Sequence, residues 1–340
     1  MPKNFFVLAL LLISNLTLAS DDKPQAESVS IIQRAVERTD IFSLPSFTIK
    51  ASVKLNVHDK SLDGTYLLYW NGPDQWKDDV ELPGYSEVQI GSKGSVYRKR
   101  STDLIPPAIA ELRSTLGFGA SPLLSRNASF RWPTLRKGET IKKVQNRKIA
   151  GTNAKCVEIL DPTKYEREVC VDEATNNLLR IKPFEDSQFL SIGDKVFPRS
   201  LSWVEDGKTH VAVRIDELTP GTQFPPNVFD VPEGANPKPG CMNPMPPEIV
   251  KKVQPQYPEA DRLGRAQGDV YVSAIIGLDG VPSQLKIVSG VSSGLNQESL
   301  NSIKSWRYEP AQCGDTPIET ENLLRVIFSL TYGSYFHSHN

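Results

Sequence analysis

The sequence predicts two domains, a mainly antiparallel β domain followed by a small α+β domain. Residues 47–57 alternate apolar and polar side chains without a break, which is typical of a half-buried strand. Similar short segments recur between Gly, Pro, Asn and Asp turns as far as residue 235. A proline-rich linker at 236–246 follows. Beyond it, the order helix, strand, strand, helix, strand over 247–333 predicts one three-stranded sheet with helices on one side.

Residues 1–19 have the features of a secretory signal peptide. Lys3 precedes the apolar run at 5–13, and Thr17 and Ala19 fit the −3 and −1 positions of a cleavage site. The alternative is an uncleaved anchor, but the run is far shorter than the ~20 residues that span a bilayer. We therefore expect export to the periplasm through a cleavable signal, and no stable transmembrane segment afterwards.

Residues 20–235 are expected to form an open, curved half-barrel with one or two helices. Apolar side chains at helical spacing predict the first helix near residues 28–41, and two prolines at the start of 105–118 indicate a second. A curved sheet that does not close can enclose an apolar cavity, which would suit a lipid or acyl chain. One face of the leading strand is expected to carry Phe47, Ile49, Ala51, Val53, Leu55 and Val57.

Four cysteines in an exported chain favour two disulfides. A turn at 161–164 places Cys156 opposite Cys170 on neighbouring strands, which makes a cross-strand bridge between them the expected pairing. Cys241 and Cys313 would then form the second pair, although three pairings are formally possible. The cysteines lack the spacing of a zinc site, so we expect no metal.

The sequence contains no convincing catalytic constellation. The segment at 290–294, GVSSG, matches G-x-S-x-G around Ser292, but a hairpin strand precedes it and no oxyanion segment accompanies it. A hydrolase using Ser292 is therefore only a third alternative. Asp78 and Asp79 are neighbours in a strand and point to opposite faces, so we expect surface charges there and no shared site. We predict a non-enzymatic protein without a cofactor.

The balance of charges argues against one class of partner. The chain has 39 basic and 40 acidic residues, a net charge of −1. Nucleic-acid binding proteins concentrate positive charge, and this chain shows no such excess. We therefore expect no nucleic-acid partner.

Residues 247–333 resemble the C-terminal domain of TonB-family proteins, and residues 334–340 read as a polar tail. The matching pieces are Tyr257-Pro258, Gly268-x-Val270, Asp279-Gly280, Val288-Ser289-Gly290 and Trp306-Arg307-Tyr308-x-Pro310-Ala311, with Gly314 and Pro317. Asp261 departs from the pattern, because the family usually has a small alanine there. Trp306 ends an apolar stripe on the last predicted helix and is expected to anchor the core.

The resemblance implies a periplasmic domain that engages an outer-membrane receptor or another envelope protein. A short receptor segment would add as a strand beside the last strand, at Leu323, Leu324, Arg325, Val326, Ile327 and Phe328. The family also couples to an inner-membrane motor through a long spacer. A linker of about a dozen residues reaches only about 40 Å, so we do not expect this chain to transduce energy alone.

The N-terminal part is more faintly similar to the LolA/LolB-like lipoprotein carriers. The likeness consists of the leading helix, the curved sheet and the ending VFDVPEGA at 228–235. Two functions follow from the two resemblances. The first is an adaptor role in the envelope, linked to TonB-dependent transport. The second is carriage of a lipid or lipoprotein in the cavity of the N-terminal domain.

Overall fold

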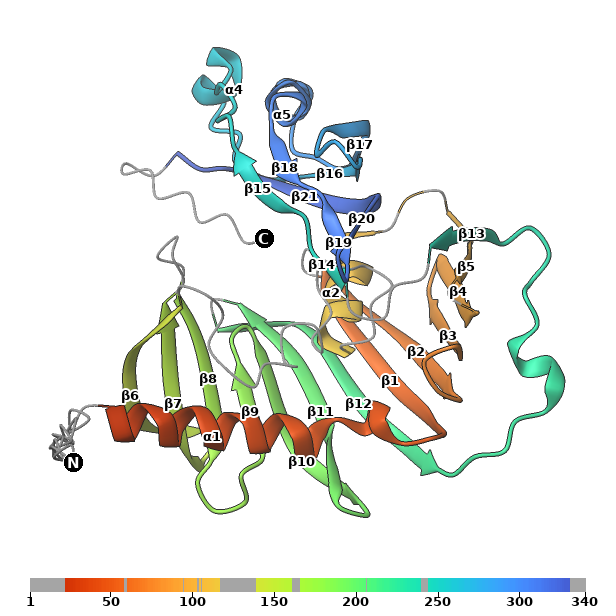
Figure 1. Cartoon of the computed structure of the whole chain (residues 1–340). Coiled ribbons are helices and arrows are strands. Elements are labelled where there is room, and N and C mark those ends of the chain that lie inside the picture. The colour runs from red at the N-terminus through yellow and green to blue at the C-terminus, as the bar shows by residue number, and fades with distance from the viewer. Residues whose placement is uncertain are drawn as a thin grey trace, which may run out of the picture.

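The computed structural model describes residues 22–57, 60–93, 95–102, 104, 106–116, 139–160, 166–205, 207–239 and 244–330. The predicted signal peptide at 1–19 and the polar tail at 334–340 lie outside these ranges. Figure 1 shows one large curved sheet, with a smaller unit formed by the last part of the chain above it. The predicted fold class, an open antiparallel β domain followed by a small α+β domain, is confirmed.

The large sheet has 13 strands and is antiparallel throughout. Two meanders, β1 to β5 and β6 to β12, join where β1 pairs with β12. The strands are β1 (Phe47–Val57), β2 (Lys60–Trp70), β3 (Gln75–Leu82), β4 (Tyr85–Ser92), β5 (Ser95–Arg100), β6 (Thr140–Ile149), β7 (Thr152–Leu160), β8 (Glu166–Asp172), β9 (Leu178–Ile181), β10 (Phe184–Ile192), β11 (Lys195–Glu205), β12 (Lys208–Pro220) and β13 (Asn236–Pro239).

The alternating pattern of β1 determines which of its faces is buried. Phe47, Ile49 and Leu55 are fully buried, while Lys50 and Lys54 between them are exposed. Side chains of a strand alternate between the two faces of its sheet, so apolar residues at every second position place one face in the core. The predicted core face of this strand is therefore confirmed from Phe47 to Leu55.

Within the described residues, two helices pack on the large sheet. The first, α1 (Asp22–Thr39), lies across β8, β9 and β11 and buries Ile32 and Ala35. The second, α2 (Pro107–Leu116), packs on β1, β11 and β12 and buries Ile109 and Leu112. The first was predicted from apolar spacing and the second from the two prolines at its start. Two 3-10 turns, η1 (Ile41–Ser43) and η2 (Pro226–Phe229), complete this part of the structure.

The C-terminal unit has the predicted order of elements. Helix α5 packs on β16 and β17 of a sheet with the order β17-β16-β21. Five short strands were not predicted, because each is too brief to carry a periodic pattern. The predicted elements are α4 (Glu259–Leu263), β16 (Gly268–Ile276), β17 (Pro282–Ser289), α5 (Ser293–Lys304) and β21 (Thr320–Phe328). The short ones are β14 (Pro244–Met245), β15 (Glu248–Lys251), β18 (Arg307–Glu309), β19 (Ala311–Cys313) and β20 (Thr316–Ile318).

The residues predicted as a linker, 236–246, contain two strands, β13 and β14. β13 extends the large sheet by pairing with β5, and its two prolines are tolerated at the edge of a sheet. β14 pairs with β19 in the C-terminal unit. The chain thus makes backbone pairs with both sheets on either side of residues 240–243. The domain boundaries themselves stay predictions.

In the described part of the chain, no helix combines the length and the apolar character that a membrane span requires.

Candidate functional site

The strand β21 is the edge of the small sheet. It pairs with β16 along its whole length, from Thr320 opposite Ile276 to Phe328 opposite Gly268. Within the ranges that the structure describes, no strand pairs with its other side. In an antiparallel ladder, every second residue directs its backbone N–H and C=O away from the partner strand. The predicted docking residues, from Leu323 to Phe328, therefore lie on an edge that can accept another strand.

The two faces of β21 differ. Val326 and Phe328 are buried in the core that α5 covers, together with Trp306. The opposite face carries Glu321, Leu323, Arg325 and Ile327, all of them partly exposed. This division follows from the period of two along a strand. The buried face holds the strand in place, and the other face is only partly covered.

Two charged residues on this second face contact the large sheet. The Glu321 carboxylate accepts hydrogen bonds from Arg98 of β5 at 2.9 Å and from Arg100 at 3.3 Å. Arg325 forms an ion pair with Asp269 of β16 at 2.6 Å and with Glu205 of β11 at 3.5 Å. Sequence reasoning missed the contacts of β21 with the large sheet. The partners in these contacts are more than 100 residues apart in the chain and leave no local signal.

A third carboxyl group, that of Glu111 on α2, lies near the same contact. Burial, together with the negative charges of Glu205 and Asp269, raises the pKa of Glu111 to about 7. The positive charge of Arg325 opposes the shift. Tyr271 of β16 is also close enough to interact, and burial raises the pKa of its phenol to about 12. Glu111 is thus a carboxyl group that titrates near neutral pH beside the contact between the two sheets.

We expect Glu111→Gln to remove a pH-dependent loss of stability. Below the usual pKa of a glutamic acid, about 4.3, the carboxyl is protonated in both the folded and unfolded states. Above about 7 it is ionised in both, and the folded protein then buries a charge. Stability is therefore lost as the pH rises through this window, and glutamine, which stays neutral, avoids the loss.

Thermal unfolding of both proteins between pH 4.5 and 8 measures this difference. The melting temperature of the wild type should fall relative to that of Glu111→Gln as the pH rises. A Glu233→Gln variant, which removes an exposed carboxyl, is the matched control and should follow the wild type. Parallel curves for wild type and Glu111→Gln would contradict the prediction.

A buried charge network lies inside the N-terminal domain and corrects an expectation from the sequence. Asp78 was expected at the surface, but it is buried, and the Arg113 guanidinium of α2 donates to both of its oxygens at 2.9 and 3.1 Å. Arg113 also lies 3.2 Å from Glu87 of β4, which pairs with Arg98 at 3.4 Å. Asp79, on the other face, pairs with Lys77 at 3.2 Å. The two aspartates do not share a site, as predicted.

The pKa values of the two buried carboxyl groups in this network shift in opposite directions. Burial raises the pKa of Asp78 in spite of the Arg113 charge. Burial would also raise the pKa of Glu87, but Arg113 and Arg98 outweigh it, and hydrogen bonds from Tyr85 and Gln89 help to lower that pKa. Arg113 thus neutralises two buried carboxylates at once. Its role is to fix α2 to β3 and β4.

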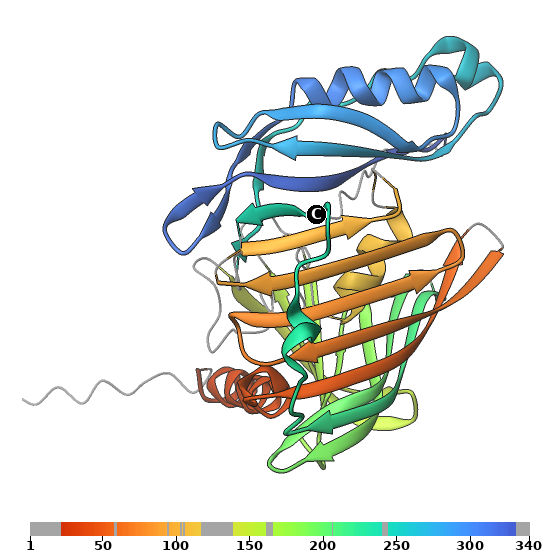
Figure 2. The same cartoon turned by 90° about the vertical axis from the view of Figure 1, so that its right-hand side faces the viewer.

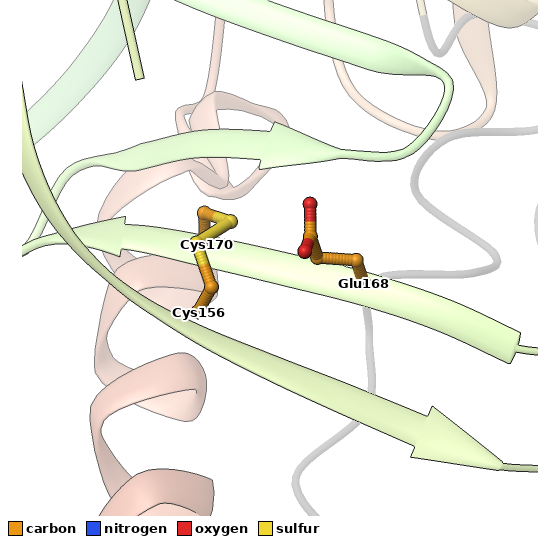
Figure 3. A group of neighbouring side chains, drawn as sticks. All are labelled: Cys156, Glu168 and Cys170. Carbon is orange, nitrogen blue, oxygen red and sulfur yellow. A yellow bond between two sulfur atoms is a disulfide. The ribbon is translucent and has the colours of Figure 1, made fainter. Parts of the chain in front are cut away.

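Cys156, Cys170 and Glu168 form a compact group that resembles a metal site (Figure 3). The two sulfurs are joined in a disulfide, which confirms the predicted cross-strand bridge. Sulfur binds metals as thiolate, so these bridged atoms are not ligands. Glu168 is already paired with Arg147 at 2.7 Å and Arg180 at 3.3 Å. The disulfide therefore links β7 to β8 covalently.

The second predicted disulfide can be followed only in part. Cys313 of β19 is disulfide-bonded. Cys241 lies outside the described residues, so the pairing of Cys241 with Cys313 stays a prediction.

Ser292, the weak candidate nucleophile, caps a helix. Its hydroxyl oxygen accepts a hydrogen bond from the backbone N–H of Leu295 at 3.1 Å, at the start of α5. A serine at this position satisfies one of the free N–H groups of the first turn. Asp261 lies at the same helix end, so close to Gly294 that a Cβ there would meet its carboxylate at 2.1 Å. Gly294 makes room for the aspartate that departs from the family pattern.

The residues that carry the resemblance to TonB-family proteins build the fold of the small unit. The turn at Asp279-Gly280 docks on Tyr308, whose N–H donates to the Gly280 carbonyl at 2.9 Å. A Cβ at Gly280 would lie 1.7 Å from the backbone carbonyl oxygen of Tyr308, so only glycine fits. Trp306 is buried, as predicted, and its indole N–H donates to the Val253 carbonyl at 2.8 Å.

A comparison with known protein families matches most of the small C-terminal unit. Residues 253–330 match the family described as the Gram-negative bacterial TonB protein C-terminal. The match covers α4, the three-stranded sheet and α5, and it includes β21. Comparison with curated proteins finds no match.

Solved structures similar to this chain share little sequence with it. A LolA superfamily protein from Nitrosomonas europaea has 10% identity and a TM-score of 0.37, covering 60% of this chain and 97% of its own. A DUF1329 family protein from Desulfovibrio piger has the same values. A MucA/MucB complex of Pseudomonas aeruginosa has 11% identity and a TM-score of 0.24, over 84% of this chain and 99% of the other. Scores this low do not support an argument about function, so the predicted lipid cavity stays a prediction.

Proposed function

We propose that this chain is a non-enzymatic protein of the Gram-negative cell envelope that binds an extended segment of a partner protein along β21. The observation that carries the proposal is the nine-residue edge strand inside a unit that matches the TonB C-terminal family. The partner is expected to be the periplasmic segment of an outer-membrane receptor or of another envelope protein. The role is that of an adaptor linked to TonB-dependent transport.

Strand addition explains how such a site works without a catalytic residue. Backbone groups of the incoming segment pair with the outward N–H and C=O groups of β21, which gives affinity with little dependence on side chains. Side chains at alternate positions then select the partner. Leu323 and Ile327 flank Arg325 on the partly exposed face, so the preferred segment should alternate apolar residues with an acidic one.

Backbone methylation of the ligand tests the proposal without altering the protein. Peptides from periplasmic segments of outer-membrane receptors are titrated into the full chain, to millimolar concentration, and binding is followed by fluorescence anisotropy. Two derivatives of any binding peptide carry N-methyl groups on alternate residues, in opposite registers. Only one register removes the N–H groups that face β21.

That register should weaken binding by roughly ten- to a hundredfold, because two or three hydrogen bonds of about 1 kcal/mol each are lost. The other register is the matched control and should retain most of the affinity. Equal loss in both registers, or failure of every receptor peptide to bind, would contradict strand addition at β21.

A further inference from the structure

The two sheets contact each other through the strand that the proposed partner needs. Both views place β21 between β16 and the large sheet (Figures 1 and 2). In Figure 2, β21 is the strand of the small sheet nearest to β5. The face of β21 that carries Glu321 and Arg325 therefore lies against the N-terminal domain.

The contact at the start of β21 is largely shielded from water. Only 12% of the Arg98 side chain, 16% of Arg100 and 17% of Glu321 is exposed. One carboxylate thus receives two guanidinium groups at a site with little solvent. Ion pairs that exclude water are less screened than those at an open surface. This cluster can hold the two sheets together.

The Arg98 side chain is also held by a contact within the large sheet, independently of Glu321. Its Nε lies 3.4 Å from Glu87, which in turn is held by the buried Arg113. A side chain that is already ordered loses less conformational entropy when it forms a further contact. The large sheet therefore presents Arg98 in a position suited to Glu321.

A second contact lies further along the same strand. Arg325 reaches Glu205 at 3.5 Å while it also holds Asp269, and its guanidinium lies 6.0 Å from the ring centre of Tyr271. Glu321 and Arg325 are four residues apart, which is about 13 Å along a strand. Two contacts at this separation fix the orientation of β21 on the large sheet as well as its position.

We propose that the N-terminal domain holds β21 in a closed state, through Arg98, Arg100 and Glu205, and that a partner strand can add only when this contact opens. The proposal rests on the proposed function, since it names what controls the same strand. The acidic residue expected in the partner would replace Glu205 beside Arg325. The affinity of the full chain is then reduced by the fraction of molecules that are closed.

Hydrogen–deuterium exchange on the full chain tests the closed state without a ligand. Glu321→Arg places a third positive charge beside Arg98 and Arg100 and should open the contact. The amides of β21 should then exchange about fivefold faster or more, a typical size for a coupling between two sites. Adding Arg100→Glu to this variant restores an opposite pair and should restore the protection.

The matched control is Glu259→Arg, the same change at an exposed ion pair of α4 in the same unit. It should leave exchange in β21 unchanged. Exchange in β17, which lies on the far side of the small sheet, shows whether each variant is folded. If Glu321→Arg also loosens β17, the single change Arg100→Glu carries the same prediction from the other side of the contact.

Receptor peptides then separate the two proposals. Faster exchange in β21 together with about fivefold tighter peptide binding by Glu321→Arg supports the closed state. Unchanged exchange in β21 overturns it, even where the wild type binds peptide. Faster exchange with unchanged affinity overturns the claim that the contact opposes strand addition. Faster exchange with no binding by either protein supports the contact and overturns the proposed function.

Discussion

Replacing Arg113 by methionine is expected to lower the free energy of unfolding by about 3–5 kcal/mol, the usual effect of removing one partner from a buried ion pair. Only 3% of the Arg113 side chain is exposed, with 2% of Asp78 and none of Glu87. Methionine fills much of the same volume, so the loss comes from charge rather than from a cavity. Asp78 would remain buried without its cation, and Glu87 would keep only Arg98.

The pH dependence of this loss identifies its cause. Without Arg113, the folded pKa of Asp78 should rise further above its unfolded value, and that of Glu87 should rise from its lowered value, because burial and mutual repulsion lose their main opposing charge. A carboxyl group whose pKa is raised on folding costs stability as the pH increases through that range. The difference between Arg113→Met and the wild type should therefore be largest near neutral pH and shrink towards pH 4.

Urea unfolding, monitored by hydrogen exchange of the β3 and β4 amides, measures the loss in the domain concerned. The matched control is Arg214→Met, because 70% of that side chain is exposed and its distance to Asp216 is 3.8 Å. Exposed pairs contribute little, so the control should change stability by less than about 0.5 kcal/mol. A loss below about 1 kcal/mol for Arg113→Met, or a loss independent of pH, would show that the network does not fix α2 to β3 and β4.

Replacing Trp306 by alanine is expected to destabilise the C-terminal unit by a similar amount, about 3–5 kcal/mol, as is typical for a buried aromatic residue. The ring belongs to the buried cluster that includes Val270, Leu295 and Phe328, and its N–H donates to the Val253 carbonyl at 2.8 Å. The substitution would leave a cavity between α5 and the sheet and remove one of the two hydrogen bonds that this carbonyl accepts, the other coming from Ser302. Because Phe328 belongs to β21, the docking strand should loosen as well.

Trp306→Phe separates the ring from its hydrogen bond. Phenylalanine keeps an aromatic ring and loses the N–H, so we expect a smaller loss, of about 1–2 kcal/mol. Leu263→Ala is the control, since 75% of Leu263 is exposed on α4 of the same unit. Exchange of the β16 amides reports each change. If Trp306→Ala unfolded no more easily than Leu263→Ala, Trp306 would not be the anchor of this core.

Regular patterns predicted much of the local structure. The alternation in 47–57 identified β1 and its buried face. The turn at 161–164 predicted the register of β7 and β8, in which Cys156 lies opposite Cys170 and Val157 opposite Val169. Such predictions succeed because the period of a strand is fixed by its backbone, and a tight turn sets the register of the strands it joins.

Features without a period were missed. No strand was predicted between Arg307 and Ile318, but this segment contains β18, β19 and β20. β19 pairs with β14 and β18 pairs with β15, both more than 50 residues earlier in the chain. Each of these pairings joins at most three residues of one strand to three of the other. The burial of Asp78 was also missed, because its partner Arg113 arrives on a helix 35 residues later.

The sequence by itself determined the two domains, the Cys156–Cys170 bridge, and the last strand of a unit that resembles the TonB C-terminal domain. These depend on local periodicity, turn chemistry and a family pattern contained in consecutive residues. Only the tertiary structure decided what lies against that edge. Arg98, Arg100 and Glu205 reach β21 from strands more than 100 residues away, and an ion pair leaves no pattern in either segment alone. The strand was predictable from its alternating pattern, but the contact proposed to close it was not.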